Sequence, residues 1–469
     1  MIALSIFFMG PPPERFDLAG RQDGFIINRT SDQGKTAAMG MLYRAYTALG
    51  SGILFSCLGP LWAYTKISGR RRRDLRERAG LVPRLIPMSS DSPRIWLHAA
   101  SLGEVRVAAG LKQHLQDLLP GCSIIVSTTT GHGRNLAANL FHDHPVFYAP
   151  VDTPFSVRNG LSRIKPDIMV FLETEIWPAW ITEARRMGVK VAIVNGRISS
   201  RSIKRYLALK PFFRDVLKNV DVFSMIHQDD AERIIRMGAD PLRVRINGNA
   251  KYELLAVGTD PSLETEARRL LNLDPAQVVL VAGSTRRGEE EMVLDAYERI
   301  SNRFPETVLI LAPRHIVRTG DIEAILRSRS IRYLLWTDLC AGARRVEPVV
   351  VLNTFGELLK LYSVGTIVFC GASLVPLGGQ NPLEPAAWGK AVFYGPFMED
   401  FLDAKALLES VDAGIEVANG KDFAEKAVAL LSDPEALKSK GKRARQALMT
   451  KIGAAERHAR VIAELAAKQ

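Results

Sequence analysis

Short apolar runs alternate with amphipathic stretches along most of this chain, and this alternation limits the possible folds more than any other feature. From Arg94 onward, the apolar runs have the length and composition of β-strands, and the stretches between them have the periodicity of helices. This spacing is typical of βαβ units, in which the strands lie parallel and helices cover the sheet. We therefore expect an α/β fold built on parallel sheets.

The predicted strands form two series, each long enough for a sheet of its own. The first series comprises Ile95–Ala99, Ile124–Thr128, Ile168–Leu172, Val189–Val194, Val222–Ile226 and Val244–Ile246. The second comprises Val278–Ala282, Val308–Leu311, Val349–Leu352, Ile367–Phe369 and Ala391–Phe393. A length of 469 residues also exceeds what one hydrophobic core usually serves.

Two Rossmann-like domains are the simplest account of this pattern. We place the first at residues 69–254 and the second at residues 263–469, the latter closed by an amphipathic helix over Ala454–Ala467. Residues 255–262 contain Gly258, Asp260 and Pro261, which favour a turn, and they are the predicted linker.

The N-terminal region has a different composition. Residues 1–40 show no periodicity and are predicted to be a disordered leader, whereas residues 41–68 are predicted to form a membrane-anchor helix. Ala45–Thr65 is uncharged over 21 residues, enough to cross a bilayer core of about 30 Å. Its glycines and Pro60 also suit a helix lying in the membrane surface, so both arrangements remain open.

Charge and cysteines limit the partners and the compartment. The net charge of +12 calls for an anionic partner, and the densest cluster, Arg70–Arg73, directly follows the uncharged stretch. If the stretch spans, the positive-inside rule puts these arginines, and with them the body of the protein, on the cytoplasmic side of the membrane, where they could contact anionic membrane lipids. The four cysteines form no C-x-x-C pair, which fits a reducing compartment and no zinc site.

Two motifs in the first half place carboxylates directly after predicted strands, where open α/β sheets bind their ligands. After the first strand, Ser101 and Glu104 have the spacing of a capping box, and Glu104 could equally serve as a general base. After the strand that ends at Leu172, Glu173 and Glu175 could serve a site or could cap the helix that Pro178 enters. The local pattern does not decide between these alternatives.

Two motifs in the second half are candidate anion sites. Gly283–Glu291 runs from a strand through a Gly/Ser/Thr loop into a helix start, whose free N–H groups favour negative charge, but it lacks the P-loop lysine. Gly378–Pro385 contains Asn381, Pro382 and Glu384 in the order of a structural helix start. Alternatively, Glu384 binds ribose hydroxyls and the loop amides bind a phosphate. His142–His144 lacks a third ligand, so we predict no metal site there.

Taken together and in this order, these motifs resemble the Kdo (3-deoxy-D-manno-octulosonic acid) transferases of lipid A and lipopolysaccharide biosynthesis. The resemblance extends from about Met41 to the end of the sequence. It rests on eight motifs: LHAASLGE at Leu97–Glu104, ETEIWP at Glu173–Pro178, NGRIS at Asn195–Ser199, GNAKYE at Gly248–Glu253, GSTRRGEEE at Gly283–Glu291, APRH at Ala312–His315, FGELLKLY at Phe355–Tyr362 and GGQNPLEPA at Gly378–Ala386.

The resemblance implies a GT-B glycosyltransferase, with two Rossmann-like domains facing a cleft. It implies inverting transfer of Kdo from CMP-Kdo, bound by the second domain, to lipid IVA, a lipid A precursor bound by the first. Glu104 matches the family's proton acceptor, and Glu173 and Lys251 match positions that stabilise the transition state. The implied CMP contacts are Pro313, Arg314, Phe355, Gly356, Glu357, Asn381, Pro382, Leu383 and Glu384.

No cofactor and no metal are expected, and nucleic acid is not an expected partner. Gln380 stands where the family usually has histidine, and Arg286 where it often has histidine, so neither position offers an imidazole. Two alternatives stay open: a GT-B transferase with a different nucleotide sugar, and a non-catalytic protein that binds an anionic surface.

Overall fold

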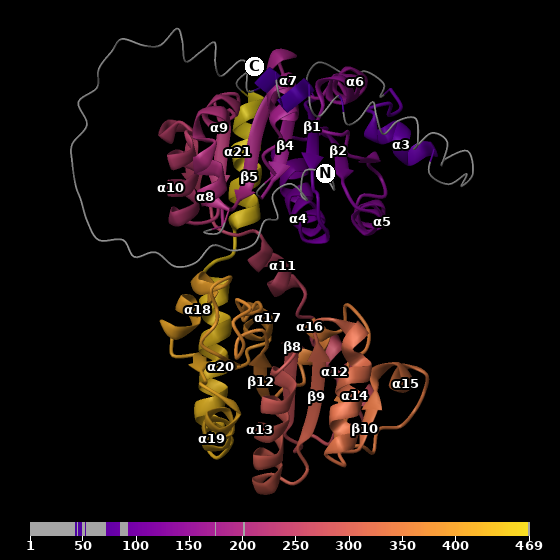
Figure 1. Ribbon diagram of the computed structural model, residues 1–469, viewed down its shortest axis with the longest axis vertical. Coiled ribbons are helices and arrows are strands. Elements are labelled where there is room, and N and C mark those ends of the chain that lie inside the picture. The colour runs from indigo at the N-terminus through magenta and orange to yellow at the C-terminus, as the bar shows by residue number, and fades with distance from the viewer. Residues whose placement is uncertain are drawn as a thin grey trace, which may run out of the picture. The chain divides into compact units, whose positions relative to one another are not determined.

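The chain folds into two compact units, each built around its own parallel sheet (Figure 1). The computed structural model describes residues 43–44, 46–48, 52, 72–84, 92–173, 175–199 and 202–467. The first unit contains the described residues up to Ala250 together with those from Ala454 onward, and the second unit is Lys251–Gly453. The prediction of an α/β fold with two parallel sheets is confirmed.

The first unit has a seven-stranded parallel sheet in the order β3-β2-β1-β4-β5-β6-β7. Its strands are β1 (Arg94–His98), β2 (Ser123–Thr128), β3 (Val146–Tyr148), β4 (Ile168–Leu172), β5 (Lys190–Gly196), β6 (Val222–Met225) and β7 (Val244–Ile246). Its helices are α3 (Arg72–Arg78), α4 (Leu102–Leu118), α5 (Gly131–Leu140), α6 (Pro154–Ile164), α7 (Pro178–Arg186), α8 (Ile203–Ala208), α9 (Lys210–Leu217), α10 (Gln228–Met237) and α21 (Ala454–Ala467), with a 3-10 turn η1 (Pro241–Arg243). Every residue of β1 and β4 is buried, because helices cover both faces of the sheet.

The second unit repeats the plan with the strand order β10-β11-β9-β8-β12-β13-β14. Its strands are β8 (Val279–Thr285), β9 (Val308–Pro313), β10 (Tyr333–Leu335), β11 (Val349–Val351), β12 (Ile367–Cys370), β13 (Val392–Tyr394) and β14 (Gly414–Glu416). Its helices are α11 (Lys251–Val257), α12 (Pro261–Leu270), α13 (Glu289–Arg303), η2 (Ile316–Arg318), α14 (Thr319–Ser328), α15 (Trp336–Cys340), α16 (Leu358–Tyr362), α17 (Leu383–Ala387), α18 (Leu402–Glu409), α19 (Gly420–Leu431) and α20 (Pro434–Met449).

In each sheet the order of the strands reverses beside the strand that comes first in the sequence; in the second sheet β11 also turns back to lie between β10 and β9. The reversal lies between β1 and β4 in the first unit and between β8 and β12 in the second. The connections that leave such a pair of strands run to opposite sides, so a crevice opens at their carboxyl ends. The loops that follow β1, β4, β8 and β12 are therefore the places where a ligand is expected.

The division of the chain corrects two predictions. Residues 255–262 are not the linker, since the division falls between Ala250 and Lys251. The turn signals there serve a helix start instead: the Asp260 side chain accepts a hydrogen bond from Ser262 N, and Pro261 occupies the first turn of α12. The final helix α21 belongs to the first unit, not the second, and lies beside β5 (Figure 1).

Burial of its apolar side and a buried histidine hold α21 to the first unit. Ala459 and Ile462 are fully buried, and the helix packs against α4, β4, β5 and β6. His458 Nε2 lies 2.9 Å from the carbonyl oxygen of Gly248, to which it must donate. Its Nδ1 then accepts from Ser224 Oγ at 2.7 Å. Burial lowers the pKa of His458 to about 4, so the ring is neutral at pH 7.

All eleven predicted strands are present, with ends shifted by no more than a few residues. The sequence pattern missed β3, β10 and β14, which have three residues each. Each of the three lies at an edge of its sheet. Three residues are too few to show the alternation of apolar and polar side chains that identifies a strand. Such a segment forms a strand because it pairs with the single strand beside it.

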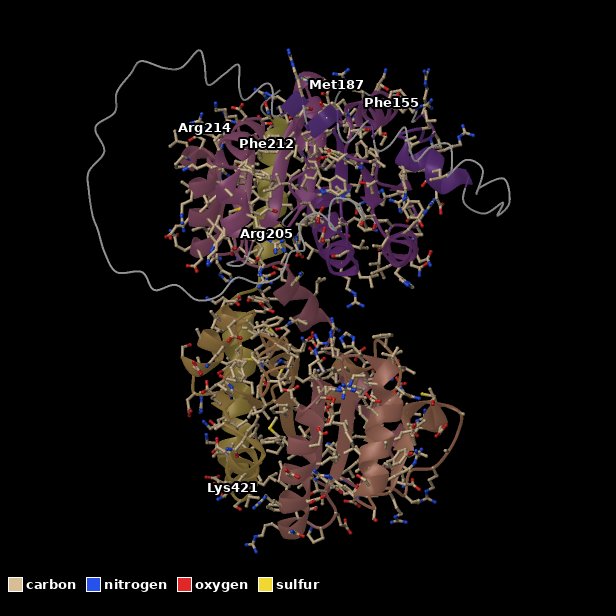
Figure 2. The ribbon with its side chains drawn as sticks, in the orientation of Figure 1. Phe155, Met187, Arg205, Phe212, Arg214 and Lys421 are labelled. Atoms are coloured by element: carbon tan, nitrogen blue, oxygen red, sulfur yellow. The ribbon has the colours of Figure 1, made fainter. Side chains whose placement is uncertain are left out.

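The predicted leader at residues 1–40 and most of the predicted anchor at residues 41–68 lie outside the described residues. Within the described part of the chain, no helix is both long and apolar enough to span a bilayer. Tyr46, near the start of the uncharged stretch, packs on the first unit: it donates a hydrogen bond to Asp152 at 2.5 Å, and its ring lies 5.7 Å from that of Phe212 on α9, which Figure 2 labels.

Replacing His458 by alanine tests how α21 is held. We expect His458→Ala to lower the free energy of unfolding of the first unit by about 2–4 kcal/mol, because it leaves Ser224 and Gly248 without a buried partner and opens a cavity. Calorimetry or urea denaturation measures the change. Arg460→Ala, at an exposed position of the same helix, is the control and should change the stability by less than about 0.5 kcal/mol. Equal effects of the two substitutions would contradict this account of α21.

Candidate active site

The turn between β1 and α4 places a carboxylate at the reversal of the first sheet. Ser101 is the N-cap of α4, and its Oγ accepts a hydrogen bond from Glu104 N at 3.3 Å. The Glu104 carboxylate reaches back and accepts from Ala100 N at 2.8 Å and from Ser101 Oγ at 2.8 Å. The predicted capping box is thus present, with Glu104 bonded to the N–H one residue before the cap.

Glu104 has the environment of a general base. Its side chain is 5% exposed, and burial raises its pKa to about 7, with further increases from the charges of Glu175 and Glu173. The hydrogen bonds from Ser101 and Ala100 act in the opposite direction. A carboxyl group whose pKa lies near neutrality can take up a proton during a reaction and release it afterwards. The capping and catalytic interpretations of Glu104 are therefore compatible.

The two acidic residues after β4 lie at the other side of the same reversal. Glu173 adopts a left-handed backbone with φ of 57°, a conformation rare outside glycine, and its N–H donates to Val194 O on β5 at 3.0 Å. Glu175 accepts a hydrogen bond from Trp177 Nε1, and burial raises the pKa of its carboxyl group. Helix α7 begins at Pro178 without a side-chain cap, so neither carboxylate serves as that cap.

A buried histidine supports this carboxylate cluster. His98, at the end of β1, is fully buried, and its Nδ1 lies 3.0 Å from Ser127 Oγ. Its Nε2 lies 3.9 Å from Glu175 Oε2. Burial lowers the pKa of His98 to about 3, so the ring is neutral at pH 7 and the contact with Glu175 is not an ion pair. The carboxylates thus keep their mutual repulsion, which helps to hold the pKa of Glu104 high.

The NGRIS and GNAKYE motifs join at the end of β5. Asn195 is buried with φ of 51°, and its Oδ1 accepts a hydrogen bond from Ala250 N at 2.9 Å. That bond fixes the residue directly before Lys251. Lys251 is the first residue of α11 and of the second unit, and Glu253 follows in the same helix.

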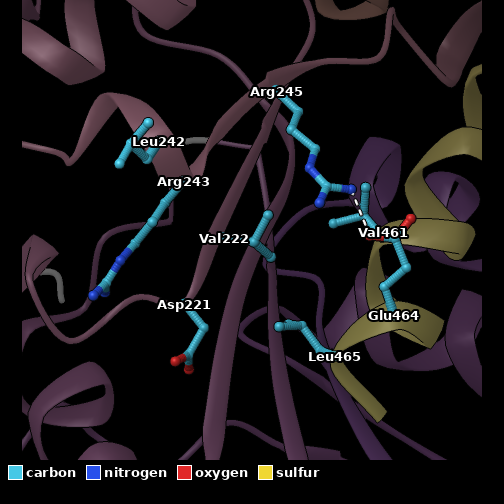
Figure 3. Close-up of a pocket in the computed structure, with 8 residues that line it drawn as sticks. All are labelled: Asp221, Val222, Leu242, Arg243, Arg245, Val461, Glu464 and Leu465. Carbon is cyan, nitrogen blue, oxygen red and sulfur yellow. Dashed lines mark hydrogen bonds and ion pairs between the residues drawn. The ribbon is translucent and has the colours of Figure 1, made fainter. Parts of the chain in front are cut away.

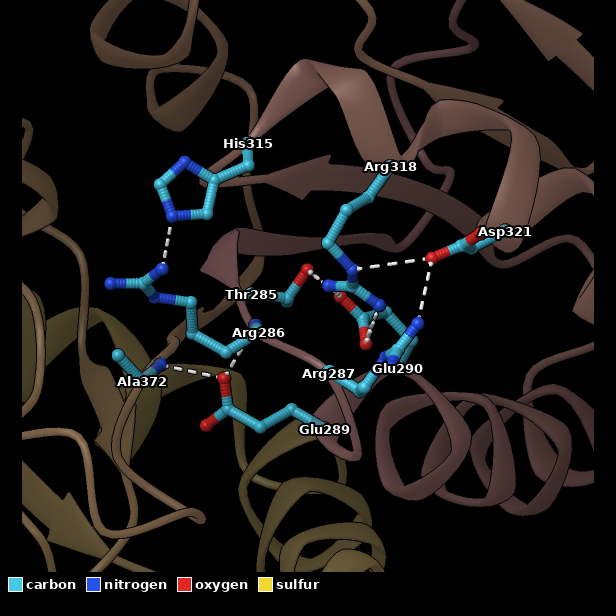
Figure 4. Close-up of polar contacts among 9 residues, drawn as sticks. All are labelled: Thr285, Arg286, Arg287, Glu289, Glu290, His315, Arg318, Asp321 and Ala372. Carbon is cyan, nitrogen blue, oxygen red and sulfur yellow. Dashed lines mark hydrogen bonds and ion pairs between the residues drawn. The ribbon is translucent and has the colours of Figure 1, made fainter.

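In the second unit, basic side chains gather at the ends of β8 and β9 (Figure 4). Arg314 follows Pro313, the last residue of β9, and its N–H donates to Thr285 O at 3.0 Å. The Arg286 guanidinium donates to His315 Nε2, which places both side chains at the same edge of the sheet. This arrangement can meet an anion with charged side chains.

The loop after β12 contains the predicted helix start, one residue later than expected. Helix α17 begins at Leu383, so Pro382 stands before it and not within it. The Asn381 side chain still acts as a cap, because its Oδ1 accepts from Leu383 N at 3.1 Å. Gly378 and Gly379 have φ of 86° and 79°, left-handed values that suit glycine. Glu384 lies in the first turn of α17.

The remaining predicted CMP contacts lie after β11. Phe355 is 70% exposed, which is unusual for a large aromatic side chain. Gly356 has a left-handed φ of 96°, and Glu357, at the start of α16, forms an ion pair with Lys360 at 2.7 Å. An exposed ring beside a glycine turn can stack on a flat aromatic ligand.

The structure therefore brings Glu104, Glu173 and Glu175 to one reversal and places the second-half motifs at the carboxyl ends of β8, β9, β11 and β12. The sequence pattern gave no function to His98 or Glu289, both fully buried and both inside the motifs. A polar residue on an otherwise apolar strand was the available signal for His98. For Glu289, the signal was the run of three acidic residues, Glu289–Glu291, that opens the helix.

Among the described residues, no group of three or more His, Cys, Asp or Glu side chains is arranged to hold a metal ion. His142 lies 2.8 Å from Asp143, and both side chains are more than 70% exposed. A pocket on the first unit lies between the β7 edge and α21, lined by Asp221, Val222, Leu242, Arg243, Arg245, Val461, Glu464 and Leu465 (Figure 3). No predicted site residue lines it.

Comparison with protein families identifies the first unit. Residues 73–254 match the family model described as 3-deoxy-D-manno-octulosonic-acid transferase (kdotransferase). The 3-deoxy-D-manno-octulosonic acid transferase of Haemophilus influenzae is 30% identical over 394 residues, which cover 83% of this chain and 91% of that protein.

A second relative is longer than this chain. The bifunctional glycosyltransferase/methyltransferase of Fusobacterium nucleatum is 34% identical over 338 residues, which cover 71% of this chain and 52% of that protein. This chain thus corresponds to about half of that relative's length.

Among solved structures, the UDP-GlcNAc 2-epimerase of Neisseria meningitidis bound to UDP-GlcNAc is similar, with a TM-score of 0.58 and 14% identity, covering 80% of this chain and all of that one. A glycosyltransferase from Rickettsia africae has a TM-score of 0.56 and 14% identity, covering 81% of this chain. At 14% identity these similarities show only that the chain shares the fold of the two proteins, which is of the GT-B type.

Replacing Glu175 tests the electrostatic account of Glu104. We expect Glu175→Gln to lower the pKa of Glu104, because it removes the neighbouring charge that contributes most to the upward shift after burial. Carboxyl ¹³C NMR of glutamate-labelled protein, with Glu104 assigned by its loss in Glu104→Gln, measures the titration. Asp117→Asn, exposed on the same helix α4, is the control and should leave the pKa unchanged. An unchanged Glu104 titration in Glu175→Gln would refute the coupling.

Proposed function

Because the chain belongs to the 3-deoxy-D-manno-octulosonic acid transferase family, we propose that it transfers Kdo from CMP-Kdo to lipid IVA, a lipid A precursor, with inversion at the anomeric carbon. The observation that carries the proposal is the buried Glu104 at the reversal of the first sheet, with a pKa of about 7. A base of this kind suits the removal of a proton from an alcohol, which is the first requirement of glycosyl transfer.

In the proposed reaction, Glu104 takes the proton from a glucosamine hydroxyl group of the acceptor lipid. The hydroxyl oxygen attacks the anomeric carbon of Kdo from the face opposite the phosphate. The bond between that carbon and the phosphate oxygen breaks, and CMP leaves with the electron pair. One base and one leaving phosphate are enough for inversion, and the proton rests on Glu104 until solvent removes it.

The transition state has positive charge on the sugar ring and growing negative charge on the phosphate. The Glu173 carboxylate, beside Glu104 in the first unit, suits the ring charge. We assign Lys251 the stabilisation of negative charge, following the family motif GNAKYE. The left-handed backbone of Glu173 supports a functional assignment, since such conformations collect at active sites.

The second unit is proposed to bind the CMP part of the donor. The guanidinium of Arg314 suits the phosphate, and the exposed ring of Phe355 can stack on cytosine. Gly356, Glu357 and the segment Asn381–Glu384 complete the proposed contacts. A positively charged arginine can stabilise a leaving phosphate without a metal, so we propose that the reaction uses no cofactor and no metal.

The proposed lipid acceptor also indicates where in the cell the protein works. An acceptor that is a lipid requires access to a membrane, and the arginine cluster at Arg70–Arg73 suits anionic headgroups. We propose that the protein works at the cytoplasmic face of the bacterial inner membrane.

The direct test is incubation of the detergent-solubilised protein with lipid IVA and freshly prepared CMP-Kdo, followed by mass spectrometry of the lipid. The expected result is a lipid heavier by one or more Kdo units. A parallel panel of UDP-sugars should give no product. Turnover with a UDP-sugar and none with CMP-Kdo would replace the proposed donor.

Replacing the base should abolish most turnover while leaving the donor bound. We expect Glu104→Gln to lower kcat about 10²–10⁴-fold, because the amide cannot accept the proton, and to keep the Kd for CMP within twofold. Single-turnover assays and calorimetric titration measure the two quantities. Asp117→Asn on the same helix serves as the control with parental activity. Near-normal product from Glu104→Gln would exclude Glu104 as the base.

The pH dependence should follow the same group. The base must be ionised to accept a proton, so lowering the pH through the raised pKa of Glu104, about 7, should decrease kcat/KM about tenfold per pH unit. Initial rates between pH 5 and 9 measure this limb. In Glu175→Gln the limb should move to lower pH, in parallel with the pKa of Glu104. A profile that stays flat from pH 8 to 5 would contradict the assignment.

A further inference from the structure

Glu289, the first residue of α13, is a fully buried carboxylate that accepts four hydrogen bonds from backbone N–H groups. Its Oε2 accepts from Arg286 N at 2.9 Å and from Ala372 N at 2.6 Å, both drawn in Figure 4. Its Oε1 accepts from Ser373 N at 2.8 Å and from Leu374 N at 2.9 Å. An ionised carboxylate can accept all four bonds at once, since each oxygen offers two lone pairs.

These four N–H groups come from two loops that lie on opposite sides of the strand reversal. Arg286 belongs to the loop after β8, and Ala372–Leu374 begins the loop after β12. The connections from β8 and β12 diverge at this point, so the parallel sheet by itself does not join the two loops. The Glu289 side chain joins them.

A backbone conformation that needs support lies at the end of β8, and another lies in the loop after β12. Ser284 and Ala372 are not glycines, yet they have φ of 57° and 58°. A left-handed conformation at such residues costs about 1–2 kcal/mol each and persists where the surroundings hold it. The hydrogen bonds of Glu289 to Arg286 and Ala372 lie within two residues of these positions.

The restraint on the second loop extends to the proposed CMP contacts. Ala372 O accepts a hydrogen bond from Gly379 N at 2.8 Å, so the peptide units on both sides of Ala372 are fixed. Gly379 precedes Gln380 and Asn381, whose side chain caps α17. A shift of Ala372 would therefore move the segment Asn381–Glu384 as well.

The neighbouring carboxylate provides a contrast. Glu290 is equally buried but accepts from Thr285 Oγ1 at 3.1 Å and pairs with Arg318 at 2.7 Å (Figure 4). It makes no bond to the loop after β12 among the described residues. Two adjacent acids of one helix thus have separate structural partners, which allows one to be changed as a control for the other.

We propose that Glu289 is a positioning residue for the nucleotide donor: it sets the spacing between the loop after β8 and the loop after β12, and through it the affinity for CMP. The inference rests on the proposed function of the second unit. Because the carboxylate of the protein already occupies these N–H groups, the phosphate of the donor must be met by other groups, among which Arg314 carries the charge.

The test is Glu289→Gln in the full-length protein. An amide has one accepting oxygen, and its NH₂ group faces two of the four N–H donors, so the loops should move apart. We expect the Kd for CMP, measured by calorimetric titration, to rise about tenfold or more, and KM for CMP-Kdo to rise with it while kcat changes less than threefold. Amide exchange of Ala372–Leu374 should become faster.

Glu290→Gln is the matched control. It should lower the melting temperature through the Arg318 pair, with the Kd for CMP kept within twofold. A folded Glu289→Gln variant with parental Kd and KM would overturn the inference and leave only a structural function for Glu289. If Glu289→Gln does not fold, Glu289→Asp takes its place, since it keeps the charge on a shorter side chain and should weaken CMP binding about threefold or more; a parental Kd in that variant overturns the inference equally.

The same titration separates this inference from the proposed function. A parent protein that does not bind CMP would refute CMP-Kdo as the donor, and the inference would fall with it. A parent that binds CMP, together with a Glu289→Gln variant that binds it equally well, would refute the positioning inference alone.

Discussion

The reversal of strand order in each parallel sheet is the constraint on which the candidate chemistry depends. The helical connections between parallel strands are right-handed. Where the strand order reverses, the loops that leave the two neighbouring strands therefore run to opposite sides of the sheet and separate at the carboxyl ends of those strands. β1 and β4 form this pair in the first unit, and β8 and β12 form it in the second. Every group with a proposed catalytic or positioning function in this protein, apart from the residues after β9 and β11 and Lys251, follows one of these four strands.

The two units use the same position for different purposes. The helix that follows the first strand of each sheet carries a buried glutamate in its first turn, Glu104 in α4 and Glu289 in α13. Both side chains reach back to backbone N–H groups of the preceding loop. Glu104 has one such donor and two acidic neighbours, so it is poised to exchange a proton. Glu289 has four donors, so its carboxylate is suited to hold loops together. The number of N–H donors and the sign of the nearby charges distinguish a base from a structural support.

The sequence predicts the central strands well because each of them is a run of apolar residues buried on both faces, as Ile168–Leu172 illustrates. It predicts the short edge strand β7 but misses the other three, β3, β10 and β14, each of which pairs with a single neighbouring strand. The assignment of α21 failed for a similar reason: its amphipathic pattern predicts a helix but carries no information about which sheet buries it. At Glu104 the local pattern was equally consistent with a cap and a base. The structure contains the cap, and the burial and like charges that favour a base come from residues about 70 positions later in the sequence.

The return of α21 to the first unit also affects how the chain can fold during synthesis. Strands β1 to β7 leave the ribosome early, but the helix that covers β4, β5 and β6 and supplies His458 is made only after the whole second unit. Until then, an apolar face of the first sheet has no permanent cover, whereas the second unit is already complete. The later unit in sequence can therefore reach its native state first, and the earlier unit must wait for a segment some 200 residues downstream. A cell that makes this protein needs to protect the exposed face of the first sheet during that interval.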